Sequence, residues 1–368
     1  MDETECWLAL ARAPGLHAGH LQEAGAAGMG ASLVGLAASE LLGRGIPNAA
    51  AQWLARPDRD TLHSDRRWLD SAGAQLIGCE SERFPPLLGQ IASAPVALYV
   101  LGGAETLLSA QLAIVGSRNP TVGGARTARE FAEFLASAGL VITSGLALGI
   151  DSSAHEGALA ARGVTLAVLG CGLDDIYPPE NRGLATRILT QGGALLSEFP
   201  PGTPPRRENF PRRNRLISGL SLGTLVVEAA RQSGSLITAR LAAEQGREVF
   251  AIPGSIHNPL ARGCHELLRQ GAKLVETAAD ILSELKIPFS KQDITESPSG
   301  STTRPGSAPG LDKDYEILLD ALGFEPQSID ALVDRTGLPS PSVASMLLIL
   351  ELEGRVGLHP GGRYVRVS

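Results

Sequence analysis

Short apolar runs alternate with stretches of helical periodicity through the middle of the chain. The apolar runs lie at 112–116, 140–144, 164–169, 194–198, 223–228, 248–252 and 273–276, and the helical stretches include 124–137, 151–161, 181–191, 235–245, 263–270 and 278–285. Continuous apolar strands that alternate with helices are typical of a parallel sheet covered on both faces. We therefore predict an α/β fold for residues 111–285, an extended Rossmann-like, doubly wound parallel sheet of roughly seven strands.

The pattern changes on both sides of this region. Residues 1–75 contain short helical stretches broken by Gly and Pro, which predict a small helical domain of the SAM or helix-hairpin-helix kind, with a generic helical cap as the alternative. Residues 76–110 predict an extended connector into the core with a strand at 95–100. The Pro, Ser and Gly of 286–311 predict a flexible linker. Residues 312–368 combine three short helical patterns with a terminal hairpin, which predicts a winged-helix domain.

Two of the predicted strands end in turns made of small residues. Gly116-Ser117-Arg118 follows the first, and Ser144-Gly145 leads through Gly149 into a helix after the second. Backbone N–H groups at such turns attract anions, and an Arg at the lip can contact a phosphate with two nitrogens. We predict a phosphate-binding crevice formed by Gly116, Ser117, Arg118, Gly145 and Gly149, although close packing of helix on sheet explains the glycines equally well.

One segment is densely basic although the chain carries a net charge of −7. Five arginines and a single acidic residue, Glu208, lie within 206–215 around Phe210. Basic side chains around an aromatic ring are typical of single-stranded nucleic-acid binding, and a solvated loop is the alternative interpretation. The predicted DNA-binding residues of this segment are Asn209, Phe210, Arg212, Arg213, Asn214 and Arg215. If a helix begins near Pro211, at most two of the last three arginines share one face.

The spacing of other residues disfavours several kinds of site. The turn after the first strand does not read G-x-G-x-x-G, and Ser144-Gly145 stands where an NAD site has an acidic residue, so we expect no cofactor. The four cysteines are too widely spaced for a metal site or a disulfide framework. No stretch resembles a signal peptide or a membrane-spanning helix, so we expect a cytoplasmic protein that does not contact a membrane.

In their order along the chain, the motifs resemble the DNA-processing protein A family (DprA, also called Smf). The resemblance covers the whole central region and rests on residues 116–118, 144–151, 154–155, 169–173, 177–181, 197–199, 209–220, 227–229, 234–239, 253–254 and 263–268. It implies a protein that protects incoming single-stranded DNA and loads the recombinase RecA onto it during natural transformation, as a homodimer and without catalysis. It also implies a dimer surface near the RecA contact, at His265, Leu267, Leu268 and Leu274, for which core packing is the alternative.

Glu228 supports a catalytic alternative. Residues 223–228 resemble the G-T-x-x-E portion of phosphoribohydrolases that act on nucleotides, although the Pro-Gly-Gly that precedes it there is absent. Release of free base from a nucleotide would distinguish such an enzyme from a DNA-binding protein. An interaction scaffold without nucleic acid is the third interpretation.

Two residues of the helical stretch 151–161 have structural interpretations. Asp151 is predicted to be the N-cap of this helix, and His155 is predicted to be a core histidine.

The winged-helix region carries a signal of its own. No Lys or Arg occurs between Arg335 and Arg355, so the predicted recognition helix at 340–353 lacks the positive charge that neutralises phosphates. We expect this domain to bind duplex DNA poorly and to serve contacts with proteins.

Overall fold

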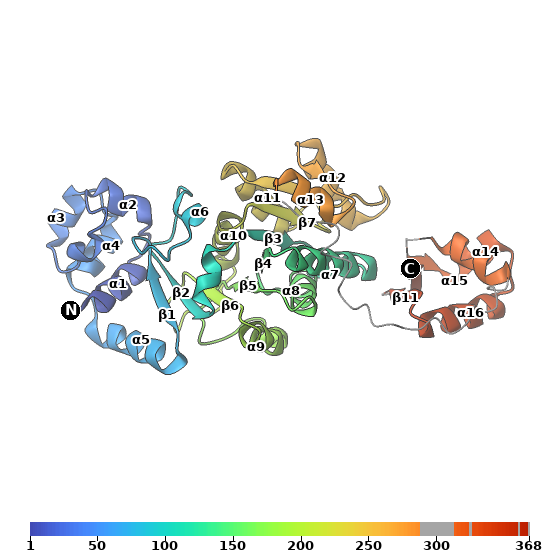
Figure 1. Ribbon diagram of the computed structural model, residues 1–368, viewed down its shortest axis with the longest axis horizontal. Helices are drawn as coiled ribbons and strands as arrows, with labels where there is room; N and C mark the ends of the chain where they lie inside the picture. The colour runs from blue at the N-terminus through green and yellow to red at the C-terminus, as the bar shows by residue number, and fades with distance from the viewer. Residues whose placement is uncertain (288–312, 324–325, 360, 367–368) are drawn as a thin grey trace.

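A nine-stranded sheet forms the centre of the molecule in the computed structural model, which describes residues 1–287, 313–323, 326–359 and 361–366 (Figure 1). The strand order is β1-β2-β6-β5-β4-β3-β7-β8-β9. Neighbouring strands from β6 through to β9 in this order run parallel. Their bounds are β3 Gln111–Val115, β4 Val141–Ser144, β5 Thr165–Val168, β6 Ala194–Ser197, β7 Gly223–Val226, β8 Glu248–Ala251 and β9 Lys273–Leu274. The predicted doubly wound α/β fold is confirmed.

The sheet is two strands wider than predicted. Strand β1 (Gln75–Gly78) pairs antiparallel with β2 (Ala97–Gly102), and β2 pairs antiparallel with β6. Strand β2 corresponds to the strand predicted at 95–100, whereas β1 lies where the predicted connector begins and was not predicted. They extend the sheet toward the N-terminal helices, and β1 forms its outer edge.

Helices cover both faces of the sheet, as the apolar strands require. One face packs against α7 (Val122–Ser137), α8 (Ile150–Ala160), α9 (Arg182–Thr190) and α13 (Ala278–Glu284). The other packs against α6 (Pro86–Gly89), α10 (Asn209–Leu220), α11 (Ser235–Glu244) and α12 (Arg262–Arg269). Short 3₁₀ helices lie at Ala104–Leu108, Pro179–Asn181 and Pro259–Ala261. From β3 the chain adds β4, β5 and β6 toward one edge of the sheet, and then adds β7, β8 and β9 toward the other edge. In doubly wound folds, ligands bind where this reversal occurs, at the carboxyl ends of the two central strands. Here these strands are β3 and β7.

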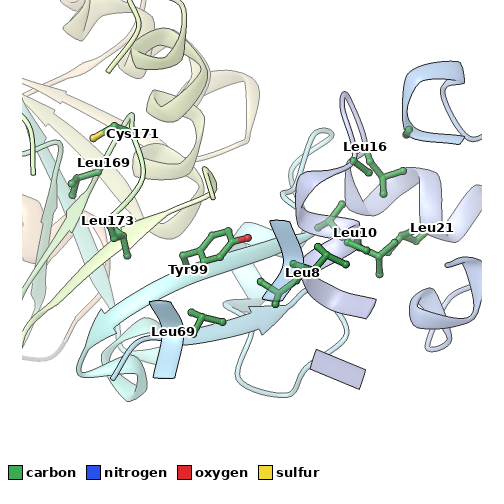
Figure 2. Packing of buried hydrophobic residues seen from close by; sticks show 14 of the residues in the cluster. Leu8, Leu10, Leu16, Leu21, Leu69, Tyr99, Leu169, Cys171 and Leu173 are labelled. Atoms are coloured by element: carbon green, nitrogen blue, oxygen red, sulfur yellow. The ribbon is translucent and has the colours of Figure 1, made fainter. Parts of the chain in front are cut away.

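The N-terminal helices pack directly on the sheet. They are α1 (Glu3–Arg12), α2 (Ala18–Glu23), α3 (Ala38–Gly43), α4 (Asn48–Ala55) and α5 (Arg59–Ala72), with a 3₁₀ turn at Gly30–Leu33. Their core is continuous with the fully buried Tyr99 of β2 (Figure 2). Arg12 donates to both carboxylate oxygens of the buried Asp65, at 2.5 and 2.6 Å, and to the Pro201 carbonyl at 3.1 Å. A bidentate, largely desolvated pair of this kind fixes one element against another, so Arg12 ties α1 and α5 to the loop before α10.

The C-terminal residues form a winged helix. Helices α14 (Lys313–Leu322), α15 (Ile329–Thr336) and α16 (Ser340–Leu352) enclose a small apolar core, with strands β10 (Gln327–Ser328), β11 (Val356–His359) and β12 (Arg363–Arg366) beside them. The predicted linker lies, from residue 288 onward, outside the described residues. The division of the chain into domains at the predicted boundaries stays a prediction.

Helix α16, the predicted recognition helix, exposes apolar side chains. Leu348, Ile349 and Leu352 are 57%, 43% and 81% exposed.

We expect that replacing Arg355, Arg363 and Arg366 together with alanine in the full chain changes the affinity for duplex and single-stranded DNA by less than about twofold, because few phosphates are neutralised here. Fluorescence anisotropy with matched oligonucleotides measures this. A loss of duplex affinity above tenfold would contradict the expectation.

His155 gives the stability of the fold a dependence on pH. The imidazole is fully buried, and Nδ1 lies 2.7 Å from Thr165 Oγ1, whose hydroxyl donates to the Ile142 carbonyl. Nδ1 is therefore the protonated nitrogen, and adding a second proton at Nε2 would place a charge in the core. Burial, with a smaller effect of Arg213, lowers the pKa of His155 to about 3. The prediction of a core histidine agrees with this geometry.

The unfolded chain therefore binds a proton at His155 between pH 6.5 and about 3 that the folded protein does not bind. Stability is lost as the pH falls below 6.5, by about 2 kcal/mol at pH 5. We expect His155→Gln to remove this part of the loss, because a glutamine amide still donates to Thr165 and does not titrate. Urea unfolding of both proteins at pH 7 and pH 5 measures the difference, and an equal loss in both would exclude the imidazole as its source.

Candidate nucleic-acid interface

The turn after β3 opens into a cavity of about 780 Å³ at the point where the strand order reverses. The cavity is lined by the turn residues Gly116, Ser117 and Arg118, by the start of α10 and by the start of α11. Ser117 Oγ accepts a hydrogen bond from the Asn119 N–H at 3.1 Å, and this bond holds the turn closed. Arg118 is exposed, and no ion pair of Arg118 occurs in the part of the chain that the structure describes. Its guanidinium is therefore available to a ligand.

Phe210 lies at the centre of a cluster of cationic and aromatic side chains. The guanidinium carbon of Arg118 lies 5.7 Å from the Phe210 ring centroid, and that of Arg213 lies 6.0 Å from it. The Tyr177 ring is tilted against Phe210 with its centroid 5.8 Å away, and Tyr177 is 42% exposed. An aromatic ring held between arginines at a cavity mouth offers a base both a stacking surface and nearby phosphate partners.

The basic segment divides into arginines that face solvent and arginines that serve the fold. Arg206 and Arg207 are exposed on the loop, and Arg207 lines the cavity. Arg212 and Arg215 lie on one face of α10 and both contact the buried Glu198, at 3.2 Å for Arg212 Nε and 2.5 Å for an Arg215 terminal nitrogen. Arg215 is only 11% exposed at its side chain, whereas Arg212 is 51% exposed and also lies over Phe199.

Arg213 points into the protein. It is 4% exposed, and one terminal nitrogen donates to the carbonyls of Gly145 and Val168. Burial lowers its pKa to about 10, against the opposing effect of the nearby Asp151. Among the other predicted residues of the segment, Asn209 is 8% exposed, and Asn214 Nδ2 donates to the Gly234 carbonyl at 3.3 Å. The predicted list therefore mixes residues that reach the cavity with residues that hold its wall.

The second turn supports the first. Gly149 has a φ of +84° and packs against the Ser117 and Arg118 carbonyls, and a Cβ at Gly145 would collide with the Arg213 guanidinium. A Cβ at Gly116 would lie 2.6 Å from Ile150. Asp151 is not the N-cap of α8, contrary to prediction. Gly149 holds that position, while Asp151 accepts from the Gly145 and Ala147 N–H groups at 3.1 and 3.3 Å.

Sequence reasoning missed the third wall of the cavity. Gln232, Ser233, Gly234, Ser235 and Thr238 line it at the N-terminus of α11, with Tyr177 opposite. Small residues between a strand and a helix are the same signal that identified the first two turns, and here it follows β7. The N–H groups of Ser235, Leu236 and Ile237 already donate to Ser233 and Gly234, so α11 attracts an anion here through the positive end of its dipole.

Glu228 lies in a different cavity and serves the fold. It is 8% exposed and accepts from the Thr121 N–H at 2.8 Å and the Thr121 hydroxyl at 2.7 Å, at the start of α7. Its cavity of about 610 Å³ lies against α7 and the loop after β8 and shares no lining residue with the cavity at Arg118. Gly223-Thr224 belongs to strand β7, where Thr224 is fully buried. Residues 223–228 match G-T-x-x-E in sequence, but Gly223 and Thr224 lie in a strand and do not form a phosphate-binding turn.

The residues predicted for a dimer surface are divided between core and surface. Leu267 is buried in the core and Leu268 packs against it. Leu274 on the edge strand β9 is 53% exposed. His265 Nε2 lies 2.9 Å from the Gly254 carbonyl.

Within the described residues, the structure contains no group of three or more His, Cys, Asp or Glu side chains arranged to hold a metal ion. Among the same residues, no helix is both long enough and apolar enough to cross a bilayer.

Comparison with known proteins identifies two matching family models. The DNA recombination-mediator protein A model matches residues 75–286, and the DprA winged-helix domain model matches residues 302–362. Protein Smf of Escherichia coli K12 is 47% identical over 318 residues, which cover 86% of this chain and 84% of that protein. DNA processing protein DprA of Streptococcus pneumoniae R6 is 46% identical over 203 residues, which cover 55% of this chain and 71% of that protein.

Two solved structures share both the fold and a related sequence with this chain. The X-ray structure of DprA from Streptococcus pneumoniae superposes with a TM-score of 0.67 at 36% identity and covers 77% of this chain and 99% of its own. DNA processing protein A from Helicobacter pylori, whose structure describes a single-stranded DNA binding mode, superposes with a TM-score of 0.52 at 31% identity. It covers 58% of this chain and 95% of its own.

Proposed function

Because the chain belongs to the DNA recombination-mediator protein A (DprA/Smf) family, we propose that it binds single-stranded DNA, protects it, and loads RecA onto it without catalysis. The observation that carries this proposal is the position of Phe210, between two arginines and a tyrosine at the mouth of the cavity beyond β3. The phosphates of a DNA strand at this point can accept hydrogen bonds from the Arg118 guanidinium, and its bases can stack on the Phe210 ring.

We assign the residues of the cavity distinct roles. Arg118, Ser117 and the N–H groups of the turn bind one phosphate, and Arg207 and Arg212 bind neighbouring ones. Phe210 and Tyr177 stack against bases, and the positive end of the α11 dipole attracts a further phosphate. Arg213, Arg215, Gly116, Gly145, Gly149 and Asn209 shape the wall of the cavity, and Asn214 links α10 to the α11 loop.

The proposal extends to partners. A homodimer doubles the number of phosphate contacts and raises the avidity of a module that makes few contacts by itself. The exposed Leu274 of β9 and the half-buried His265 of α12 form the surface that we propose for the partner copy and for RecA.

A salt series tests the proposed binding mode. We expect oligo-dT to bind more tightly than a matched duplex, with little dependence on base sequence. Three or four neutralised phosphates predict that the logarithm of the affinity falls against the logarithm of salt with a slope of about −2 to −3. Fluorescence anisotropy with labelled oligonucleotides measures both quantities. Equal affinity for duplex and single strand, or binding that does not respond to salt, would exclude this mode.

A further inference from the structure

Strand β1 forms one edge of the nine-stranded sheet, next to the N-terminal helices (Figure 1). The Cys79 N–H donates to the Val96 carbonyl at 2.8 Å, which fixes the alternation of the antiparallel pair. Gln75 and Ile77 therefore direct their N–H and C=O groups toward β2, because hydrogen-bonded pairs recur at every second residue. Leu76 and Gly78 direct theirs away from the sheet.

The outward groups of β1 are mostly unpaired, but Leu76 is half-buried and Gly78 is buried under the Trp7 ring. The Gly78 carbonyl accepts from the Ser81 N–H at 3.0 Å. Among the residues that the structure describes, the Leu76 N–H, the Leu76 carbonyl and the Gly78 N–H have no hydrogen-bond partner. Unpaired edge groups of this kind are a template for another strand.

A groove runs beside this edge. Its volume is about 430 Å³, and it is lined by Leu76 and Gly78 of β1, by the first turns of α1 including Trp7, and by the loop at Met29. The Trp7 ring lies 2.7 Å from the place where a Cβ of Gly78 would stand, so only glycine allows the indole to pack there. Met29 is 60% exposed. The groove thus offers apolar contacts directly next to free backbone groups.

The charge of the groove is negative. Glu3 and Glu80 line it. Glu3 is exposed, and both oxygens of Glu80 accept from the Gly30 N–H, at 3.1 and 3.2 Å, which leaves the carboxylate charge in place. Residues 1–110 contain 12 acidic and 7 basic side chains, so the surroundings favour a cationic ligand.

We propose that this groove is a docking site for an extended segment of another protein, which adds a strand to β1 and carries an apolar residue flanked by Lys or Arg. The segment pairs with the N–H and the carbonyl of the half-buried Leu76. Its apolar side chain packs on Trp7 and Met29, and its basic side chain faces Glu3 and Glu80. Strand addition gives affinity through the main chain and selectivity through alternate side chains. This site is independent of the proposed DNA cavity.

A synthetic peptide tests the site on the full chain. The probe is a fluorescein-labelled nonapeptide of alternating lysine and valine, compared with the same peptide N-methylated at its central residues and with a version that has glutamate for lysine. We expect binding of the first peptide and at least about tenfold weaker binding of the other two, because N-methylation removes a backbone donor and glutamate reverses the charge. Amide exchange of Leu76 is expected to slow at least about tenfold in the complex.

Variants locate the contact. Glu3→Gln with Glu80→Gln is expected to weaken binding about tenfold, and Glu82→Gln, an exposed neighbour outside the groove, serves as the matched control. Leu76→Pro removes an outward donor without removing a bond to β2, which a proline on an edge strand tolerates. Equal binding of the N-methylated peptide would overturn the proposal. So would a Leu76 amide that is already protected in the free protein, which would mean that a second copy or a segment of this chain occupies the edge.

Discussion

Replacing Arg118 with alanine is expected to weaken binding of single-stranded DNA by about ten- to a hundredfold and to leave the melting temperature unchanged. A guanidinium that contacts a phosphate contributes about 1.5–3 kcal/mol. Arg118 is exposed at the end of β3 with its guanidinium next to Phe210, so its removal costs the ligand two contacts. Within the described residues, the Arg118 side chain makes no hydrogen bond or ion pair that the fold would lose.

Anisotropy titrations with oligo-dT across a salt series measure this effect. The salt slope is expected to fall by about 0.7, the value for one phosphate on a single strand. Arg126→Ala is the matched control, because Arg126 is an exposed arginine on α7, the helix after this turn, that pairs with Glu130 at 2.6 Å and lies outside the cavity. If the two variants bind DNA equally well, the strand does not pass the turn after β3.

The strands and helices of the central region follow from the sequence because each short apolar run can be buried only inside a two-sided sheet. The signal at Ala113-Ile114-Val115 needs no knowledge of tertiary contacts. Strand β1 escapes the same reasoning. It has only four residues, Gln75 to Gly78, and the pairing with β2 that orders it depends on contacts about twenty residues away in the chain. Edge strands of this length carry little periodicity.

The candidate site was predictable only in part for a related reason. The charge and the spacing of the basic segment predict where the arginines lie. They do not predict which of these side chains form bonds within the protein and are therefore not free to bind DNA. Helical spacing places Arg212 and Arg215 together, and in the structure a buried Glu198 from the loop after β6 meets both. The direction of Arg213 depends on the carbonyls of Gly145 and Val168, which are distant in sequence. Tyr177 reaches the cavity through tertiary packing, whereas the turn before α11 carries the same small-residue signal as the first two turns.

Arg213 and Arg118 make opposite predictions although both lie against Phe210. Arg213→Met is expected to lower the free energy of unfolding by about 3–5 kcal/mol, the usual cost of removing one member of a buried charged cluster. The substitution leaves the Gly145 and Val168 carbonyls without their donor and leaves the buried Asp151 without the nearby positive charge. Methionine keeps most of the side-chain volume, so the loss reports the polar contacts rather than a cavity.

Urea unfolding followed by circular dichroism measures the change, with Arg212→Met as the control on the exposed side of the same helix. Adding Asp151→Asn to Arg213→Met is expected to recover part of the lost stability, because the amide no longer carries a buried negative charge that Arg213 balanced. The same substitution in the wild-type background is expected to destabilise, since it breaks the cluster from its other side. A folded Arg213→Met protein with unchanged stability and lost DNA binding would instead assign this guanidinium to the ligand and not to the wall of the cavity.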